Sequence, residues 1–158
     1  MIPGIPVLNC VQLSPYNSQH EEWLLFAKKI RKGLGNETAL NDIREFIEYY
    51  WQHHIQRHFC REERIIIPFI KSSEPAAQLQ KEHDDIRELI LSLNHTSDRS
   101  LFSILANFIE NFIRFEKYII STFLTAILST EEFDAIFTNL EKQPVMYKEW
   151  KHKFWMKG

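Results

Sequence analysis

Glycine is almost absent from this chain where the backbone would need to turn, and this constrains the fold more than any other feature. The 158 residues include 4 glycines, and none lies between Gly35 and Gly158. Within that stretch the only prolines are Pro68, Pro75 and Pro144. Folds made of strands and tight turns, and nucleotide-binding folds with glycine-rich loops, need more of these residues. We therefore expect long helices joined by few connections.

The spacing of apolar residues supports this expectation, because they recur every three or four positions over long segments. The pattern predicts helices at about 18–34, 39–67, 74–93 and 98–128, and a short helix at 131–140. Short loops force neighbouring helices to run antiparallel. We therefore predict an all-α fold: an up-down-up-down four-helix bundle over residues 17–140 with a short extra C-terminal helix. An extended lead-in (1–16) precedes it and a basic aromatic tail (141–158) follows it.

The same pattern predicts helix starts and buried positions. Ser18 and Glu21 have the spacing of a capping box at the first helix, and Thr130 is placed to cap the short helix. The predicted buried stripes include Leu24 in the first helix, Ile65 in the second, and Leu105, Phe112, Glu116, Ile119, Phe123 and Ile127 in the fourth.

Composition limits the class of protein. Hydrophobic residues make up 44% and charged residues 25%, which is typical of a soluble globular domain, and the net charge of −2 gives no general attraction to nucleic acid. No apolar run approaches the ~20 residues that span a bilayer, and the first residues lack the features of a signal peptide. The only cysteines, Cys10 and Cys60, form no CxxC motif. These features predict a reduced, cytoplasmic protein.

Ionisable residues interrupt the apolar stripe of every long helix. They are His20, His58, Glu62, His83 and Glu116. His58 and Glu62 are four residues apart and therefore share one helix face. Imidazoles and carboxylates that meet inside a bundle favour a metal site for iron, manganese or zinc. The alternative is a metal-free polar layer held by hydrogen bonds.

The segment from His58 to Pro68, HFCREERIIIP, resembles the H-F-x-x-E-E-x-x-hydrophobic-x-P signature of the hemerythrin-like HHE cation-binding family. Glu82–Arg87, EHDDIR, resembles the third-helix E-H-x-x-I-R element of that family. The family's fourth-helix pattern, H-I-x-x-E-E, aligns with Phe112–Lys117, FIRFEK. The resemblance covers about residues 14–140 and implies a non-haem iron protein that binds or senses O2 or NO, or handles iron.

The resemblance implies a ligand set with one departure. In di-iron members, histidines of the first and second helices hold one iron, those of the third and fourth hold the other, and two glutamates bridge. Carried over, His20, His58, Glu62 and Glu116 serve the first ion. The second keeps His83 and the bridging glutamates, because Phe112 replaces the fourth-helix histidine. The expected site is therefore mononuclear or an impaired di-iron site.

Several neighbours of these residues have open roles. His54 is one turn before His58 and is either a substitute ligand or a residue that supports the ligands. Glu63 is expected to form a salt bridge rather than to ligate, and Arg87 is a candidate partner for a carboxylate. Cys60 points away from the face of His58.

The tail contains five lysines within residues 142–158 and several aromatic residues. Its aromatic side chains either pack on the bundle or on a second copy or protein partner, or contact nucleic acid or a membrane surface. The chain's negative net charge favours packing. No catalytic residues are predicted, and the alternative function is a metal-free bundle that serves as an interaction or structural module.

Overall fold

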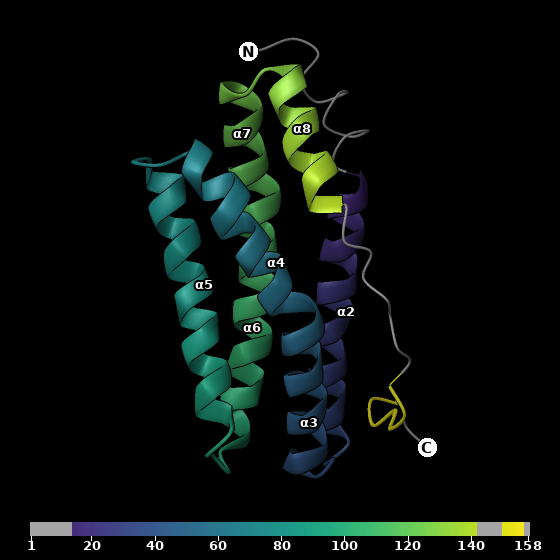
Figure 1. The fold of residues 1–158 in the computed structure, drawn as a ribbon. Helices are drawn as coiled ribbons and strands as arrows, with labels where there is room; N and C mark the ends of the chain where they lie inside the picture. Colours follow the sequence, from purple (N-terminus) through teal and green to yellow (C-terminus); the bar gives the residue numbers. More distant parts are fainter. Residues whose placement is uncertain (1–13, 142–149, 157–158) are drawn as a thin grey trace.

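The structure is a computed structural model that describes residues 14–141 and 150–156, with side chains for 20–136 and 150–156. Every regular element in these ranges is helical (Figure 1). The elements are α2 (Ser14–Gly35); α3 (Leu40–Tyr50), η1 (Trp51–Ile55), α4 (Gln56–Arg61), η2 (Glu62–Ile66) and η3 (Ile67–Phe69); α5 (Glu74–Leu93); α6 (Arg99–Phe115), η4 (Glu116–Ile120) and α7 (Ser121–Ile127); and α8 (Thr130–Glu141). The predicted all-α bundle is confirmed.

Four long helical segments lie side by side, and the short helix α8 folds back beside α7 (Figure 1). α6 packs against both α2 and α5, so it is central to the bundle. The second segment, from α3 to η3, is bent: α3 lies beside α2, whereas the end of this segment approaches α5. None of the helices in the described ranges is both long and apolar enough to cross a membrane.

Three wide turns interrupt the second and fourth segments. In η1, η2 and η4 the backbone N–H at the end of the turn bonds to a carbonyl five residues earlier: Gln56 to Trp51, Ile67 to Glu62, and Ser121 to Glu116. These are π-helical turns, and each adds one residue to an otherwise α-helical path. The extra residue of η4 displaces the buried positions that follow it in the fourth segment by one residue.

This displacement explains where the predicted stripes are wrong. Ile119 and Ile127 are 49% and 46% exposed, whereas Ile120 and Leu124 are buried. In the second segment Ile66 is fully buried, whereas the predicted Ile65 is partly buried and packs against the core. Before η4, the predicted positions Leu105, Phe112 and Glu116 are fully buried, and the predicted Leu101 and Phe108 are partly buried against the core.

Other corrections concern helix starts and one core position. α2 begins at Ser14, so Ser18 lies inside the helix and does not cap it. The capping box of α8 is formed by Ser129 and Glu132, whose side chains accept from each other's backbone N–H at 3.1 and 3.0 Å, so Thr130 is not the cap. Leu24 is 42% exposed, and Phe26 is buried instead.

The described part of the tail packs on the bundle. The Phe154 side chain is 4% exposed, its ring centroid is 5.3 Å from that of Phe46, and its carbonyl accepts from the Asn36 side chain at 3.1 Å. Gly33 permits this approach, because a Cβ at that position would lie 2.5 Å from the Phe154 ring. The described tail residues therefore pack on the bundle, which is one of the alternatives predicted from the sequence. Residues 14–16 of the predicted extended lead-in belong to helix α2, and residues 1–13, 142–149 and 157–158 lie outside the described residues.

Candidate metal centre

Two carboxylates lie at the centre of the bundle, each at the first residue of a π turn. Glu62 begins η2 and Glu116 begins η4, and both side chains are fully buried at 0% exposure. π turns occur preferentially at functional sites, because the widened helix changes the direction of its side chains. Burial of two carboxylates is costly unless cations or hydrogen-bond donors compensate their charge.

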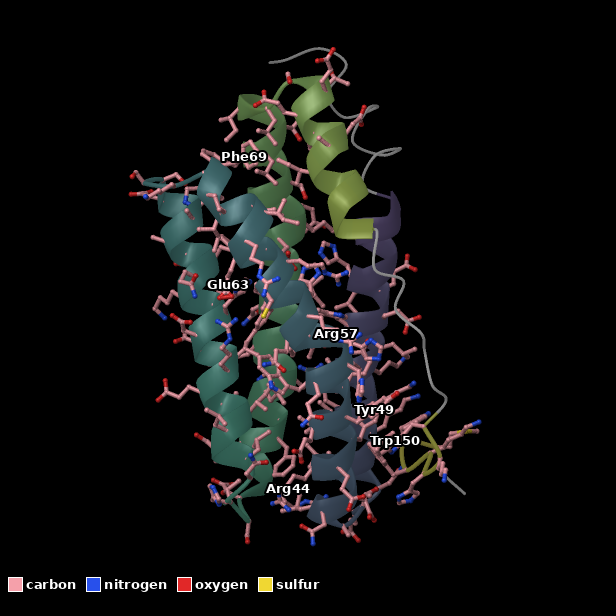
Figure 2. All side chains as sticks on the ribbon, viewed as in Figure 1. Arg44, Tyr49, Arg57, Glu63, Phe69 and Trp150 are labelled. Atoms are coloured by element: carbon pink, nitrogen blue, oxygen red, sulfur yellow. The ribbon has the colours of Figure 1, made fainter. Side chains whose placement is uncertain are left out.

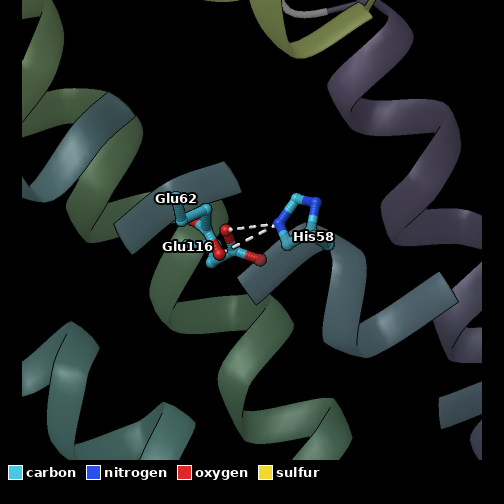
Figure 3. Close-up of side chains that lie close together, drawn as sticks. All are labelled: His58, Glu62 and Glu116. Carbon is cyan, nitrogen blue, oxygen red and sulfur yellow. Dashed lines mark hydrogen bonds and ion pairs between the residues drawn. The ribbon is translucent and has the colours of Figure 1, made fainter. Parts of the chain in front are cut away.

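The imidazole of His58 faces both carboxylates through one nitrogen (Figure 3). Its Nε2 is 3.0 Å from Oε1 of Glu62 and 3.2 Å from Oε2 of Glu116. Each of the three residues offers one ligand atom, and these atoms lie within 4.8 Å of one another. The α-helical spacing of His58 and Glu62 puts both on one face, and the crossing of α6 onto that face brings in Glu116.

The pKa values of His58 and Glu116 depend strongly on the charges of the neighbouring groups. Burial opposes protonation of His58, but the attraction of Glu62 and Glu116 outweighs it and raises the pKa of the imidazole to about 10. Burial alone would raise the pKa of Glu116, yet His58 and the hydrogen bonds around the carboxylate hold that pKa well below its ordinary value. In the metal-free protein, His58 is therefore an imidazolium that donates to both carboxylates.

Two further histidines complete the cluster from the outer helices. Nε2 of His20, on α2, lies 3.5 Å from Oε1 of Glu116. Nε2 of His83, on α5, lies 3.1 Å from Oε1 of Glu62. Their side chains are 4% and 0% exposed, respectively. The structure thus brings together all five residues that the sequence pattern selected, one or more from each long segment.

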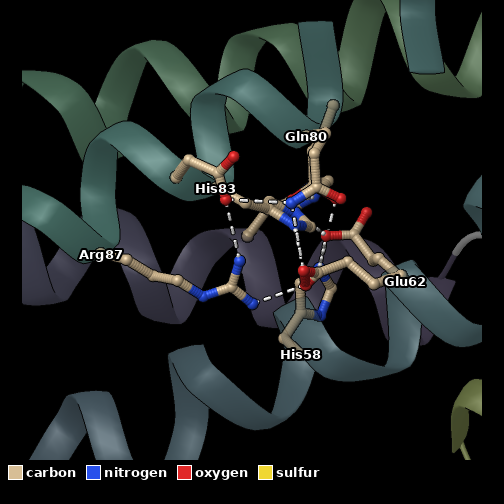
Figure 4. A network of polar contacts seen from close by, with 9 residues as sticks. His58, Glu62, Gln80, His83 and Arg87 are labelled. Atoms are coloured by element: carbon tan, nitrogen blue, oxygen red, sulfur yellow. Dashed lines mark hydrogen bonds and ion pairs between the residues drawn. The ribbon is translucent and has the colours of Figure 1, made fainter. Parts of the chain in front are cut away.

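The second ring nitrogen of His83 faces a network of its own (Figure 4). Nδ1 of His83 is 3.5 Å from Oε2 of Glu63, and the same oxygen accepts from Arg87 at 2.5 Å. Gln80 donates to the other Glu63 oxygen at 3.3 Å. Burial would raise the pKa of Glu63, but the hydrogen bonds from Arg87 and Gln80 and the charges of Arg87 and His83 lower it. A carboxylate behind an imidazole fixes the ring's orientation and tautomer.

This network agrees with the sequence-based expectation that Glu63 forms a salt bridge and that Arg87 pairs with a carboxylate. Sequence reasoning missed Gln80. The signal was available, because Gln80, His83 and Arg87 recur at intervals of three and four residues and so share one side of α5.

Phe112 closes the cluster on the side of His83. It is 0% exposed, and its ring centroid lies 5.4 Å from that of His83 and 5.2 Å from that of Phe59. Trp23 stacks on it at 5.9 Å. An aromatic wall without lone pairs therefore stands beside His83, one helical turn before Glu116.

His54 has different surroundings. Its ring lies 4.5 Å from that of Tyr50 and 6.3 Å from that of Tyr49, and it lines a separate cavity beside the C-terminal segment. Burial, followed by the nearby charges of His53 and Arg57, lowers the pKa of His54 to about 4. His54 is therefore neutral at pH 7, and nothing in this arrangement tests its proposed role as a substitute ligand.

The donor set fits a divalent metal of intermediate softness. It consists of carboxylate oxygens and imidazole nitrogens, with no thiolate, and such mixed sets suit iron, manganese and zinc. A bound cation would take the place of the proton on His58 and neutralise the two buried carboxylates. The buried His/Glu group can therefore hold a metal ion on chemical grounds.

Comparison with known proteins gives one match. Residues 16–120 match the family model described as "Hemerythrin HHE cation binding domain", which is well over half of the chain. No curated protein and no solved structure matches the chain.

Proposed function

Since the chain belongs to the hemerythrin HHE cation-binding family, we propose that it is a non-haem iron protein whose metal lies in the bundle interior. The observation that carries this proposal is the pair of fully buried carboxylates, Glu62 and Glu116, with an imidazole of His58 in contact with both. Such a group is costly to bury in a structural core, whereas a metal site requires it.

The arrangement supports one metal ion with a sufficient set of ligands rather than two. His20, His58, Glu62 and Glu116 would hold it, and the Glu63–Arg87 pair would orient His83 next to it. Phe112 offers no lone pair where a second ion would need a ligand. Bound iron with an open coordination position supplies reversible binding of a small diatomic molecule such as O2 or NO. The protein's own residues would keep that position inside a largely apolar core, and we infer a role in binding, sensing or iron handling.

The test is elemental analysis of protein purified without an affinity tag. We expect close to one metal ion per chain, and the element found decides between iron, manganese and zinc. His58→Ala and Glu62→Ala should each lose most of it. His95→Ala is the matched control, because this histidine is exposed at the end of α5 and should leave the content unchanged. Equal metal content in all four proteins would refute the site.

Thermal unfolding gives a second, independent readout. A metal that binds only the folded bundle stabilises it by about 3–4 kcal/mol at a hundred to a thousand times its dissociation constant. Chelation should therefore lower the melting temperature while helicity at 25 °C persists.

A metal-free interaction module is the second candidate, and one observation favours it. The proton on His58, whose pKa is raised to about 10, compensates one of the two buried carboxylate charges without any metal. On this proposal the tail or another surface contacts a second copy or a protein partner. Identical melting temperatures before and after chelation, with no metal in the purified protein, would support it over the iron protein.

A further inference from the structure

A cavity of about 550 Å³ lies outside the metal cluster, between α2, the second helical segment and the C-terminal segment. Its walls are mainly aromatic, and they include Phe46, Tyr49, Tyr50, Trp150 and Trp155. This volume is in the range of cavities that take small organic molecules. The cavity exists because residues 150–156 fold back onto the bundle and supply one wall.

The aromatic rings come from two distant parts of the chain and face each other. The rings of Tyr49 and Trp150 are 5.1 Å apart, and Figure 2 shows them meeting where the C-terminal segment meets the helix. Trp150 and Trp155 approach Phe46 at 5.8 and 5.5 Å. Flat apolar surfaces of this kind favour a planar ring system, which can pack against them.

Two ammonium groups converge on the same cavity. Lys29 and Lys153 both line it: burial lowers the pKa of Lys29, the attraction of Glu22 raises it, and the repulsion of Lys153 lowers it. Glu22 supplies the single carboxylate among the lining residues, and His54 is neutral there because its pKa is about 4. With two ammonium groups against one carboxylate, the lining carries an excess of positive charge, which favours an anionic ligand.

A cationic guest is disfavoured by a specific contact. The Nζ of Lys29 already lies 4.3 Å from the centroid of the Trp155 ring, where a cation–π ligand would bind. The indole N–H of Trp150 is buried, and no acceptor lies within reach of it among the described residues. A ligand with an acceptor group would satisfy this donor.

We propose that this cavity is a binding site for a planar aromatic molecule that carries an anionic group. The rings pack against the aromatic lining of the cavity, and the anion lies near Lys29 and Lys153. The site is independent of the metal cluster and does not rest on the proposed function.

The experiment uses two fluorescent probes with the same rings, the anion 8-anilinonaphthalene-1-sulfonate and its neutral counterpart N-phenyl-1-naphthylamine. We expect the sulfonate to bind at one site per chain, about tenfold more tightly than the neutral probe, which is the change expected for one partly desolvated charged contact. Salt should weaken the sulfonate alone.

Two substitutions that each remove one charge give opposite results if the proposal is correct. Lys29→Gln should weaken sulfonate binding about tenfold, whereas Glu22→Gln should strengthen it. Lys71→Gln, an exposed lysine in the loop before α5, is the matched control and should change nothing. Circular dichroism and the melting temperature verify that each variant is folded.

Other outcomes overturn the proposal. Equal affinity for the two probes, or a decrease in both Lys29→Gln and Glu22→Gln, would mean that the charges do not select an anion. Sulfonate binding that survives Trp155→Ala in a folded protein would place the probe elsewhere. Glu62→Ala should leave binding intact, so failure of the metal site and failure of this site are distinguishable.

Discussion

Replacing Phe112 by histidine adds an imidazole where the HHE family pattern has one. The Phe112 ring centroid lies 5.4 Å from that of His83, and its backbone is one turn before Glu116. An imidazole there would face His83 across the cluster and supply the nitrogen that a second ion lacks. Phe112→His should therefore raise the metal content from about one ion per chain towards two.

The cost of this substitution follows from the packing of Phe112. Cutting a buried Phe to Ala costs ~3–5 kcal/mol. Histidine keeps a ring against Trp23, Phe59 and His83, and each aromatic pair contributes ~0.5–1.5 kcal/mol beyond buried area. The polar nitrogens, however, enter an apolar pocket at about 1–3 kcal/mol. Without metal we expect the variant to lose about 2–4 kcal/mol, and metal at a hundred times its dissociation constant should restore about 2.7 kcal/mol.

The assay combines elemental analysis with urea unfolding of metal-free and metal-loaded samples. Phe102→His is the matched control, because Phe102 is equally buried on the same helix but ten residues away, about 15 Å along its axis. It should lose similar stability and gain no metal. An unchanged metal ratio in folded Phe112→His would refute the reasoning.

Three further predictions test other features of the bundle. The pKa of His54 is lowered to about 4 from 6.5 in the folded protein, so as the pH falls the unfolded chain binds this proton before the folded chain does. The free energy of unfolding should therefore be unaffected by His54 above pH 6.5 and should decrease between pH 6.5 and pH 4, by about 3 kcal/mol at most. Urea unfolding of metal-free His54→Gln should show a smaller loss over this interval than the parent, and equal losses would contradict the assignment. Glu63→Gln should weaken metal binding about 10-fold or more while changing stability little, because the His83 ring would no longer be held in its orientation. Competition with a metal-binding dye measures the affinity, and an unchanged affinity would count against the role of this network. Gly33→Ala should displace Phe154, at about 1–3 kcal/mol, and expose the C-terminal segment to limited proteolysis; a cleavage rate equal to that of the parent would show that the contact is not needed.

The bundle and the five cluster residues could be predicted because both depend on local spacing. A histidine and a glutamate four residues apart share a helix face whatever the rest of the chain does, and short loops leave few ways to arrange four helices. His20, His83 and Glu116 stand out for the same reason, since each is ionisable on an otherwise apolar stripe.

The remaining features depend on information that uniform helical spacing lacks. Ile120 is buried in place of Ile119 because the backbone N–H of Ser121 bonds to the carbonyl of Glu116, five residues earlier. The spacing of apolar residues does not predict such a bond. The aromatic cavity needs Trp150 to meet Tyr49, about a hundred residues earlier in the chain, and no local pattern links them. Phe26 replaces Leu24 in the core because α3 supplies aromatic partners, Phe46 and Tyr50, at 5.3 and 4.2 Å.

We expect that the extra residue of the wide turn at η4 can be removed from the fourth helix. Lys117, Tyr118 and Ile119 are all exposed, and the buried positions that follow Glu116 are Ile120, Ser121 and Leu124. Deleting one of the three exposed residues would place those buried residues three, four and seven positions after Glu116, which is the ordinary spacing of an amphipathic α-helix. The shortened chain can therefore keep its core while it loses the widened backbone at the carboxylate. Such a deletion separates what the extra residue contributes to folding from what it contributes to the geometry of Glu116.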